Sequence, residues 1–267
     1  MAIISLLSDF GHKDPYVAEM KAIILSINPT VRIVDITHEI EKFNIRMGAY
    51  VLASATPYFP KNTVHEAVVD PSVGTKRRPV IVETSRSLYV GPDNGLLMLA
   101  AHKEHITNVY EINNPEYMMP NVSKTFHGRD IFAPAAAHLT EGNKPSTFGS
   151  VIHDYIVPHF VKPRQRHGEL LGEVLHVDDF GNAISNISAE DLKKMDIHKQ
   201  DALQVRLGRK IMTLRFCSAY GDVPIGTPLA LIGGSNFLEV AVNQESASKS
   251  LSAKVGDAFH VSVALSS

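Results

Sequence analysis

Cysteine is almost absent from this chain of 267 residues, which contains Cys217 alone. A single cysteine excludes an intrachain disulfide, and we expect a cytoplasmic protein in which Cys217 is structural. The formal net charge is only −2, so we expect no nucleic-acid partner. No apolar run approaches the roughly 20 residues that span a bilayer, and we expect no membrane partner. The first residues lack a charged leader segment and are interpreted as a first strand.

Common nucleotide and hydrolase motifs are also missing. The sequence contains neither a G-x-G-x-x-G fingerprint nor a G-x-x-x-x-G-K-[ST] phosphate loop. It also lacks an H-E-x-x-H pair and a nucleophile elbow. Dinucleotide, nucleoside triphosphate, zincin and serine-hydrolase functions therefore lose their main support.

Apolar runs alternate with helical periodicity in the first half of the chain. Residues 2–7 and 31–36 predict strands, and Val17, Met20 and Ile24 lie on one face of a helix that ends at Asn28-Pro29. Further strands near 64–69, 79–83 and 87–90 and a helix over 45–58 continue the alternation. We therefore predict an α/β N-terminal domain, residues 1–163, with a largely parallel sheet flanked by helices.

The second half has a different pattern. Seven short strands are expected between Leu170 and Val263, and only one helical piece, Ala189 to Met195, interrupts them. We predict a smaller C-terminal antiparallel β domain, residues 168–267, after a linker near Lys162 to His167.

The segment from Val68 to Arg78 combines a strand end with charged residues. Asp70 follows an apolar run, Pro71 and Gly74 indicate a turn, and Arg77 comes seven positions after the carboxylate. Open α/β sheets place ligands at the carboxyl ends of their strands, where this pair would meet. A salt bridge that only braces the loop is the alternative interpretation.

Three other segments also combine a strand end, small residues and charge. They are Ser8-Asp9-Phe10-Gly11, Phe126 to Asp130, and Asp178-Asp179-Phe180-Gly181-Asn182. A carboxylate beside a glycine can accept hydrogen bonds from both hydroxyls of a ribose, because glycine lets the sugar approach. Four such segments in two domains favour a ligand cleft between the domains.

With these motifs the sequence resembles the S-adenosylmethionine (SAM) hydrolases, also called SAM hydroxide adenosyltransferases, which are related to fluorinases and chlorinases. The resemblance runs nearly end to end. The motifs that carry it are Ser8 to Gly11 with Tyr16-Val17, Asp35 to Ile40, Val69 to Arg77, Gly91 to Gly95, Thr125 to Asp130, Asp178 to Asn182 and Phe237 to Asn243.

The resemblance implies a fold, a reaction and a site. It implies a homotrimer in which one subunit's N-domain meets its neighbour's C-domain around SAM, which reacts with water to give adenosine and L-methionine. It implies no cofactor and no metal. The implied catalytic residues are Asp70, Arg77 and His127. The implied substrate-binding residues are Asp9 for the ribose, Phe43 beside the sugar, Asp178 and Ser235 for methionine, and Phe180, Asn182, Val242 and Gln244 for adenine.

Two positions depart from the family's pattern. Asn236 replaces the usual glycine of the turn that holds Ser235, and asparagine tolerates the left-handed backbone that glycine would supply. Glu245 stands where a glycine is usual, next to the adenine-binding edge.

The proposed chemistry needs little from the site. A sulfonium leaves as a neutral thioether, so neither a general acid nor a metal is required, and the protein must position one water in line with the C5′–S bond. We expect Asp70 and Arg77 to orient this water. His127 is the expected proton acceptor, because a guanidinium stays protonated.

Other functions stay open at this point. The 13 histidines raise the hypothesis of a metal hydrolase with His127 and Asp130 or His38 as ligands, although their spacing matches no tight metal signature. A non-catalytic adenosine- or SAM-binding protein could use the same scaffold. A halogenase is disfavoured, because the halogenating relatives have tyrosine at the position of Asp70 and threonine at that of Val73.

Overall fold

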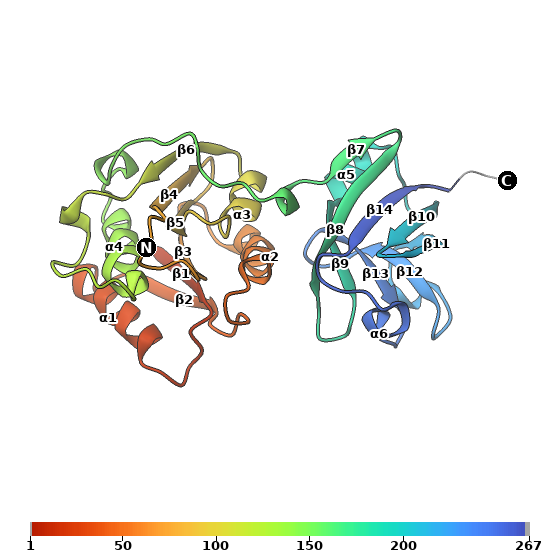
Figure 1. Ribbon diagram of the computed structural model, residues 1–267, viewed down its shortest axis with the longest axis horizontal. Helices are drawn as coiled ribbons and strands as arrows, with labels where there is room; N and C mark the ends of the chain where they lie inside the picture. The colour runs from red at the N-terminus through yellow and green to blue at the C-terminus, as the bar shows by residue number, and fades with distance from the viewer. Residues whose placement is uncertain (1, 265–267) are drawn as a thin grey trace. The chain divides into compact units, whose positions relative to one another are not determined.

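The computed structural model describes residues 2–264, which fold into two compact units (Figure 1). The first unit ends at Pro158 and the second begins at His159. Within the described residues there are fourteen strands and six α-helices, so the chain is mostly β. Figure 1 shows the helices gathered mainly around the sheet of the first unit.

The first unit is a six-stranded sheet covered by helices. The strand order is β2-β1-β3-β5-β4-β6. Helices α1 and α4 pack together on one face, and α2 and α3 pack together on the other. The strands are β1 (Ile3–Ser8), β2 (Arg32–Thr37), β3 (Val64–Val68), β4 (Pro79–Thr84), β5 (Leu88–Pro92) and β6 (Ile106–Glu111). The helices are α1 (Tyr16–Ile27), α2 (Ile45–Ala55), α3 (Met98–Lys103) and α4 (Ala133–Thr140), with short turns η1 (Thr56–Tyr58), η2 (Pro115–Tyr117), the π-helical η3 (Gly128–Phe132) and η4 (Pro145–Thr147).

The prediction of a largely parallel sheet is wrong, because this sheet is mixed. Strands β2, β1, β3 and β5 run parallel, but β4 is antiparallel to both β5 and β6. Only residues 85–87 join β4 to β5. A parallel connection needs a crossover of a dozen or more residues, so this short turn forces the antiparallel pairing.

The second unit is a closed barrel of seven strands, which corrects the prediction of a smaller antiparallel β domain. The order is β14-β10-β11-β12-β13-β9-β8, and pairing of β14 with β8 closes the ring. One pair, β11 with β12, is parallel. The strands are β7 (Arg164–Arg166), β8 (Glu169–Val177), β9 (Ala183–Ser188), β10 (Ala202–Leu207), β11 (Lys210–Cys217), β12 (Pro228–Ile232), β13 (Phe237–Val242) and β14 (Ala258–Val263). The helices are α5 (Ala189–Lys194) and α6 (Ala247–Leu251), with turns η5 (His159–Val161) and η6 (Tyr220–Asp222).

Alternation along the barrel strands creates the core of the second unit. In β10 the side chains of Leu203, Val205 and Leu207 are buried, and the residues between them are exposed. The buried side chains belong to one apolar cluster with those of neighbouring strands. A period of two therefore separates the barrel interior from its surface. Cys217 is buried at the end of β11, and burial raises the pKa of its thiol.

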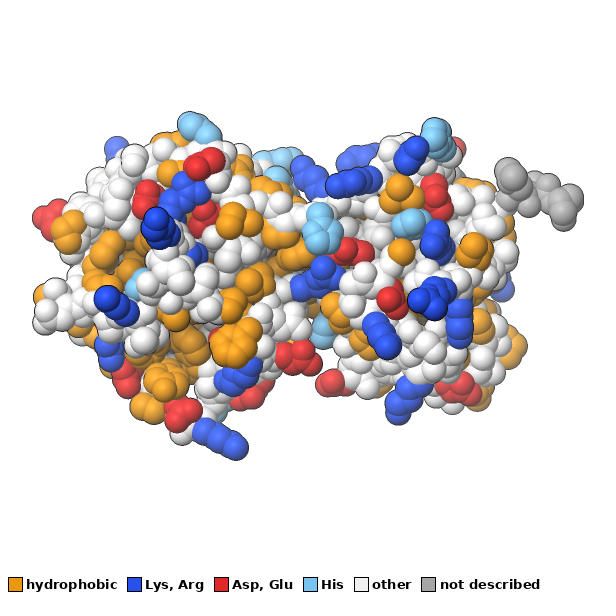
Figure 2. All heavy atoms as spheres, viewed as in Figure 1, with side chains coloured by type: hydrophobic (Ala, Val, Ile, Leu, Met, Phe, Trp, Pro, Cys, Tyr) orange, Lys and Arg blue, Asp and Glu red, His pale blue; other side chains and the backbone are white. Residues whose placement is uncertain are grey.

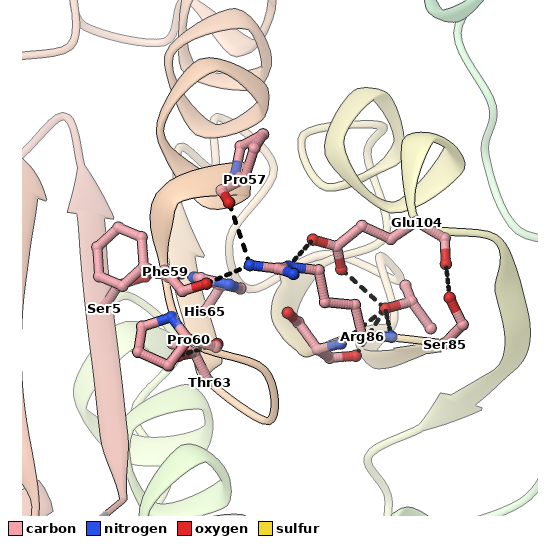
Figure 3. A network of polar contacts seen from close by, with 11 residues as sticks. Ser5, Pro57, Phe59, Pro60, Thr63, His65, Ser85, Arg86 and Glu104 are labelled. Carbon is pink, nitrogen blue, oxygen red and sulfur yellow. Dashed lines mark hydrogen bonds and ion pairs between the residues drawn. The ribbon is translucent and has the colours of Figure 1, made fainter.

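Strand β3 carries titratable side chains on both faces of the first sheet. His65 is fully buried and contacts Ser5, with Nδ1 2.7 Å from Oγ, and burial lowers the pKa of its imidazole to about 3. Figure 3 shows this pair beside Arg86, which donates to the carbonyl oxygens of Pro57 and Phe59. The next residue, Glu66, faces the opposite side of the sheet, and its complete burial raises the pKa of its carboxyl well above the usual range. Burial therefore favours the neutral form of both groups.

Charges of both signs are interspersed over the face shown in Figure 2. Among the helices described, none is long and apolar enough to cross a lipid bilayer.

Candidate functional site

Three parallel strands of the first unit deliver polar residues to one edge of the sheet. In the β1–β3 register Ser8 pairs with Val68, so Asp9 leaves its strand next to the segment that carries Asp70. On the other side of β1, Leu7 pairs with Thr37 of β2. Because parallel strands end at the same edge, three loops converge there.

Asp70 and Arg77 form a buried ion pair at this edge. Both side chains are only 4% exposed. Arg77 Nε donates to Asp70 Oδ1 at 3.2 Å, and Arg77 Nη2 donates to Asp70 Oδ2. Ser72 Oγ also donates to Asp70 Oδ1, at 3.2 Å. The guanidinium carbon lies 5.4 Å from the centre of the Phe132 ring. This two-point contact holds both charged groups in one orientation.

His127 completes the network from a different loop. Its Nδ1 lies 2.9 Å from Arg77 Nη2. Because a guanidinium can only donate, Nδ1 accepts, and the neutral ring carries its hydrogen on Nε2. Burial and the charge of Arg77 lower the pKa of His127, while Asp70, Asp130 and a hydrogen bond with the Ser123 backbone oppose the shift. The uncharged imidazole is therefore favoured.

A local irregularity in the chain sets the position of His127. The residue precedes the π-helical turn Gly128–Phe132, which leads directly into α4. Pro134 has no N–H, so it cannot bond the carbonyl of Asp130 four residues earlier. That carbonyl accepts instead from Met119 N at 2.8 Å, and the Asp130 carboxylate accepts from Ser123 N at 2.8 Å. The two bonds tie the loop before His127 to the start of the helix.

These side chains line a cavity of about 590 Å³ in the first unit. Asp9 is 5% exposed, and its Oδ2 accepts from Phe43 N at 2.9 Å. Phe43 is 67% exposed and has φ 66°, a left-handed conformation that is unusual for an aromatic residue. The residues around the cavity are Asp9, Phe10, Asp14, Tyr16, Lys42, Phe43, Val68, Asp70, Val73, Ser123, Thr125, Phe126, His127, Gly128 and Arg129.

A second cavity, of about 490 Å³, lies in the second unit. Its walls are formed by Phe180, Asn182, Tyr220, Val242, Asn243, Gln244, Glu245 and Ser246. Phe180 is 81% exposed. Its turn is held by Asp178, which accepts from Asn182 N at 2.8 Å and from Asn182 Nδ2 at 3.0 Å. The structure thus brings four of the predicted binding residues to one cavity, and Asp178 bonds to one of them, Asn182.

Two residues near glycine positions adopt left-handed backbone. Asn236 has φ 64°, as the sequence predicts for a residue that replaces glycine. Beside Glu245, Gln244 has φ 60°, and Glu245 N donates to the carbonyl of Val242 at 3.0 Å. The tight turn after β13 is therefore kept without glycine. Ser235 is not among the residues that line the second cavity.

Comparison with known proteins identifies the family. Models of the SAM hydroxide adenosyltransferase N-terminal and C-terminal domains match residues 4–149 and 172–260. The chain belongs to the SAM hydroxide adenosyltransferase family. An (R)-S-adenosyl-L-methionine hydrolase from Thermus thermophilus is 38% identical over 96% of this chain and 98% of its own. One from Methanocaldococcus jannaschii is 35% identical, over 97% and 95%.

More distant and structural relatives extend this similarity. A fluorinase from an Actinoplanes species is 28% identical over 90% of this chain and 91% of its own. The crystal structure of an uncharacterised conserved protein from Thermotoga maritima has a TM-score of 0.86 and 41% identity, covering 97% of this chain and 99% of that one. The resemblance recognised from the motifs is therefore confirmed at the level of the family.

Sequence reasoning missed several residues around the two cavities. In this family member, Phe10, Tyr16 and Phe126 form an edge-to-face cluster with ring centres 5.2–5.8 Å apart. All three lie within motifs that carry the resemblance, and this was the available signal. In the second unit, Tyr220 OH donates to Glu239 Oε1 at 2.6 Å, and burial raises the pKa of that carboxyl. Tyr220 lies outside every motif, so nothing in the sequence indicated it.

Metal ligation has no geometric support in the described part of the chain. Within residues 2–264 there is no group of three or more His, Cys, Asp or Glu side chains that could hold a metal ion. The proposed ligands His127 and His38 instead face Arg77 and Asp35, respectively.

Gly74 lets the Asp70–Arg77 loop meet the loop before His127. It has φ +76°, and an added Cβ would lie 2.2 Å from the carbonyl oxygen of Lys124. We expect Gly74→Ala to destabilise the protein by about 2–4 kcal/mol, because backbone strain and a clash with main chain both act there. Chemical denaturation measures this loss.

Gly142→Ala is the matched control, because Gly142 has φ +95° but nothing within 4 Å of an added Cβ. Its expected cost is the strain alone, about 1 kcal/mol. Equal losses in the two variants would show that close packing of the two loops does not depend on Gly74.

Proposed function

We propose that this chain hydrolyses S-adenosyl-L-methionine to adenosine and L-methionine. The observation that carries the proposal is the buried Asp70–Arg77 pair at the wall of a cavity that also contains Asp9. Membership of the family and the names of its relatives support the reaction. Asp9 is the proposed acceptor for the ribose hydroxyls, and Phe43 the proposed wall beside the sugar.

The proposed step is in-line attack of one water on the ribose C5′ carbon. A C–O bond forms, the C5′–S bond breaks, and the sulfur leaves as the thioether of methionine. Because the leaving group is already cationic and departs neutral, no proton has to be donated to it. Most of the catalysis then comes from holding the water in line, dry and oriented.

The geometry supports a different role for His127 from the one expected from the sequence. Its Nδ1 lone pair already accepts from Arg77, so a neutral ring has no free lone pair to take a proton. We propose that His127 orients Arg77 and that Asp70 receives the proton of the water. A weak base is enough, because a water oxygen becomes strongly acidic as its bond to carbon forms.

The hydrolase relatives favour water over halide as the nucleophile. They are 34–38% identical to this chain, whereas the fluorinases are 26–28% identical. Asp70 also adds a negative charge at the place where a halide would have to bind, which disfavours an anionic nucleophile.

The proposed binding residues for adenine and methionine belong to the second unit. They are Asp178, Phe180, Asn182, Ser235, Val242 and Gln244. We propose a homotrimer in which the first unit of one subunit and the second unit of its neighbour together bind one substrate. Large exposed aromatic side chains in both cavities, Phe43 and Phe180, support such association.

The substrate prediction includes the configuration at sulfur. The relatives are named for the (R) epimer, so we expect the purified protein to release adenosine and methionine from (R)-SAM faster than from the (S) epimer. Asp70→Asn should lower kcat by about 10²–10⁴ while adenosine still binds. Chromatography of the products measures the preference between epimers and the loss of kcat. Release of 5′-chloro-5′-deoxyadenosine in chloride, or equal turnover by Asp70→Asn, would contradict the proposal.

The role of His127 predicts the pH dependence. Burial and the charge of Arg77 lower the pKa of His127 from the usual range of a histidine, so we expect kcat/KM to fall as the pH decreases through that lowered pKa and Arg77 loses its acceptor. His127→Asn keeps an acceptor that does not titrate, and we expect it to retain kcat within about tenfold and to lose this limb of the profile. A loss of about 10²–10⁴, as for removal of a general base, would return the proton to His127.

Shared binding between subunits predicts complementation. Asp70→Asn and Asp178→Ala should each be nearly inactive alone. Co-expressed with different tags and purified through both, they should form mixed trimers in which some sites combine two unaltered units. Activity no higher than that of the better single variant would contradict the shared arrangement, and a mass other than three chains by light scattering would contradict the trimer.

A further inference from the structure

Four polar side chains form a continuous hydrogen-bond network next to the turn that carries Asp9. The proposed reaction does not use this network. Lys21 Nζ donates to Asp35 Oδ2 at 2.6 Å, and Asp35 Oδ1 lies 3.1 Å from His38 Nε2. His38 Nδ1 lies 2.7 Å from Ser8 Oγ. The network ends at the backbone of Phe10, whose N–H donates to Ser8 Oγ at 3.3 Å.

The donors and acceptors of this hydrogen-bond network fit only one arrangement of hydrogens when His38 is neutral. The Asp35 carboxylate can only accept, so His38 carries its hydrogen on Nε2. Nδ1 is then an acceptor and receives the Ser8 hydroxyl hydrogen. Ser8 Oγ keeps a lone pair for the N–H of Phe10. His38 is 1% exposed, and its burial lowers the pKa of the ring, which favours the neutral form.

A serine, a histidine and an aspartate in line are also the parts of a hydrolytic triad. Ser8 is fully buried, however, and is absent from the walls of the cavity. A hydroxyl that no substrate can reach does not act as a nucleophile. The hydrogen-bond network must therefore act through the backbone turn that Ser8 holds.

That backbone surrounds the proposed ribose acceptor. Asp9 lies between Ser8 and Phe10, and Gly11 N donates to the carbonyl of His38 at 2.7 Å. His38 thus bonds the turn on both sides of Asp9, once through its ring and once through its carbonyl. The carboxylate itself is aimed by Phe43 N, which lies in the same loop after β2.

We propose that His38 is a positioning residue for nucleoside binding, with its tautomer set by Asp35 and its effect transmitted through Ser8 to the turn that carries Asp9. This inference rests on the proposed function, because it takes Asp9 to bind the ribose. It assigns a role to the Asp35–Ile40 motif, which the reaction leaves without one.

The test uses Ser8→Ala, Asp35→Asn and the double variant, each in the full chain. We expect Ser8→Ala to weaken adenosine binding about tenfold, the equivalent of one lost hydrogen bond, and Asp35→Asn to weaken it about threefold. Because both would act through the same link, the double variant should be no weaker than Ser8→Ala alone. KM should rise with kcat within about twofold, since the ribose contact is made equally in the ground and transition states.

His12→Ala is the matched control. The His12 ring packs edge-on against the His38 ring, with ring centres 5.3 Å apart, but His12 is exposed and takes no part in the hydrogen-bond network. Its adenosine affinity, measured by calorimetry, and its steady-state kinetic parameters should equal those of the parent. Adenosine affinity within twofold of the parent in both single variants, or additive losses in the double variant, would overturn the inference. Failure of the unaltered protein to bind adenosine would overturn the proposed function itself, and the two outcomes are therefore distinguishable.

Discussion

The buried pair of Asp70 and Arg77 is the constraint on which the candidate site depends. Two charges that are each 4% exposed have lost most of their hydration, and their mutual contacts, together with hydrogen bonds to Ser72 and His127, compensate for it. Removal of one partner would leave the other charge buried and unpaired, at a cost of about 3–5 kcal/mol. The loop between them therefore has little freedom, and every group that approaches it must fit its shape. His127 contacts Arg77, and the carbonyl of Lys124 lies where a side chain at Gly74 would have to go.

The helix that follows His127 supplies the other half of this constraint. The missing N–H of Pro134 frees one carbonyl in the first turn, and the chain uses it to hold the preceding loop at Met119. An α-helix with a residue other than proline at position 134 would have used that acceptor internally. The π-helical turn thus converts a backbone defect into a fixed position for the imidazole, which is a common use of such turns.

The residues of the candidate site stand out in the local sequence, whereas the sheets that carry them do not. Asp9 and Asp70 each follow the end of an apolar run, and His127 lies in a short segment of small and charged residues before a helix. These local signals need no knowledge of the fold. The direction of β4 depends on the three-residue link to β5, and closure of the barrel depends on pairing of β14 with β8, which are far apart in the chain. Long-range pairing of this kind leaves almost no trace in a local pattern. The ring nitrogen that faces Arg77 was likewise unpredictable, because it depends on a rotamer rather than on residue type.

The proposed reaction needs little basicity from the site. The proposed proton acceptor, Asp70, is a carboxylate, and carboxylates as a class are too weakly basic to abstract a proton from free water. It is no disadvantage if the proton leaves only after the oxygen has begun to bond to carbon. In the proposed reaction the ion pair would then serve mainly to direct one lone pair of the attacking water toward the ribose C5′ carbon. A stronger base at this position would therefore not help the proposed step. A carboxylate free to rotate would lose the alignment of the water on which in-line displacement depends.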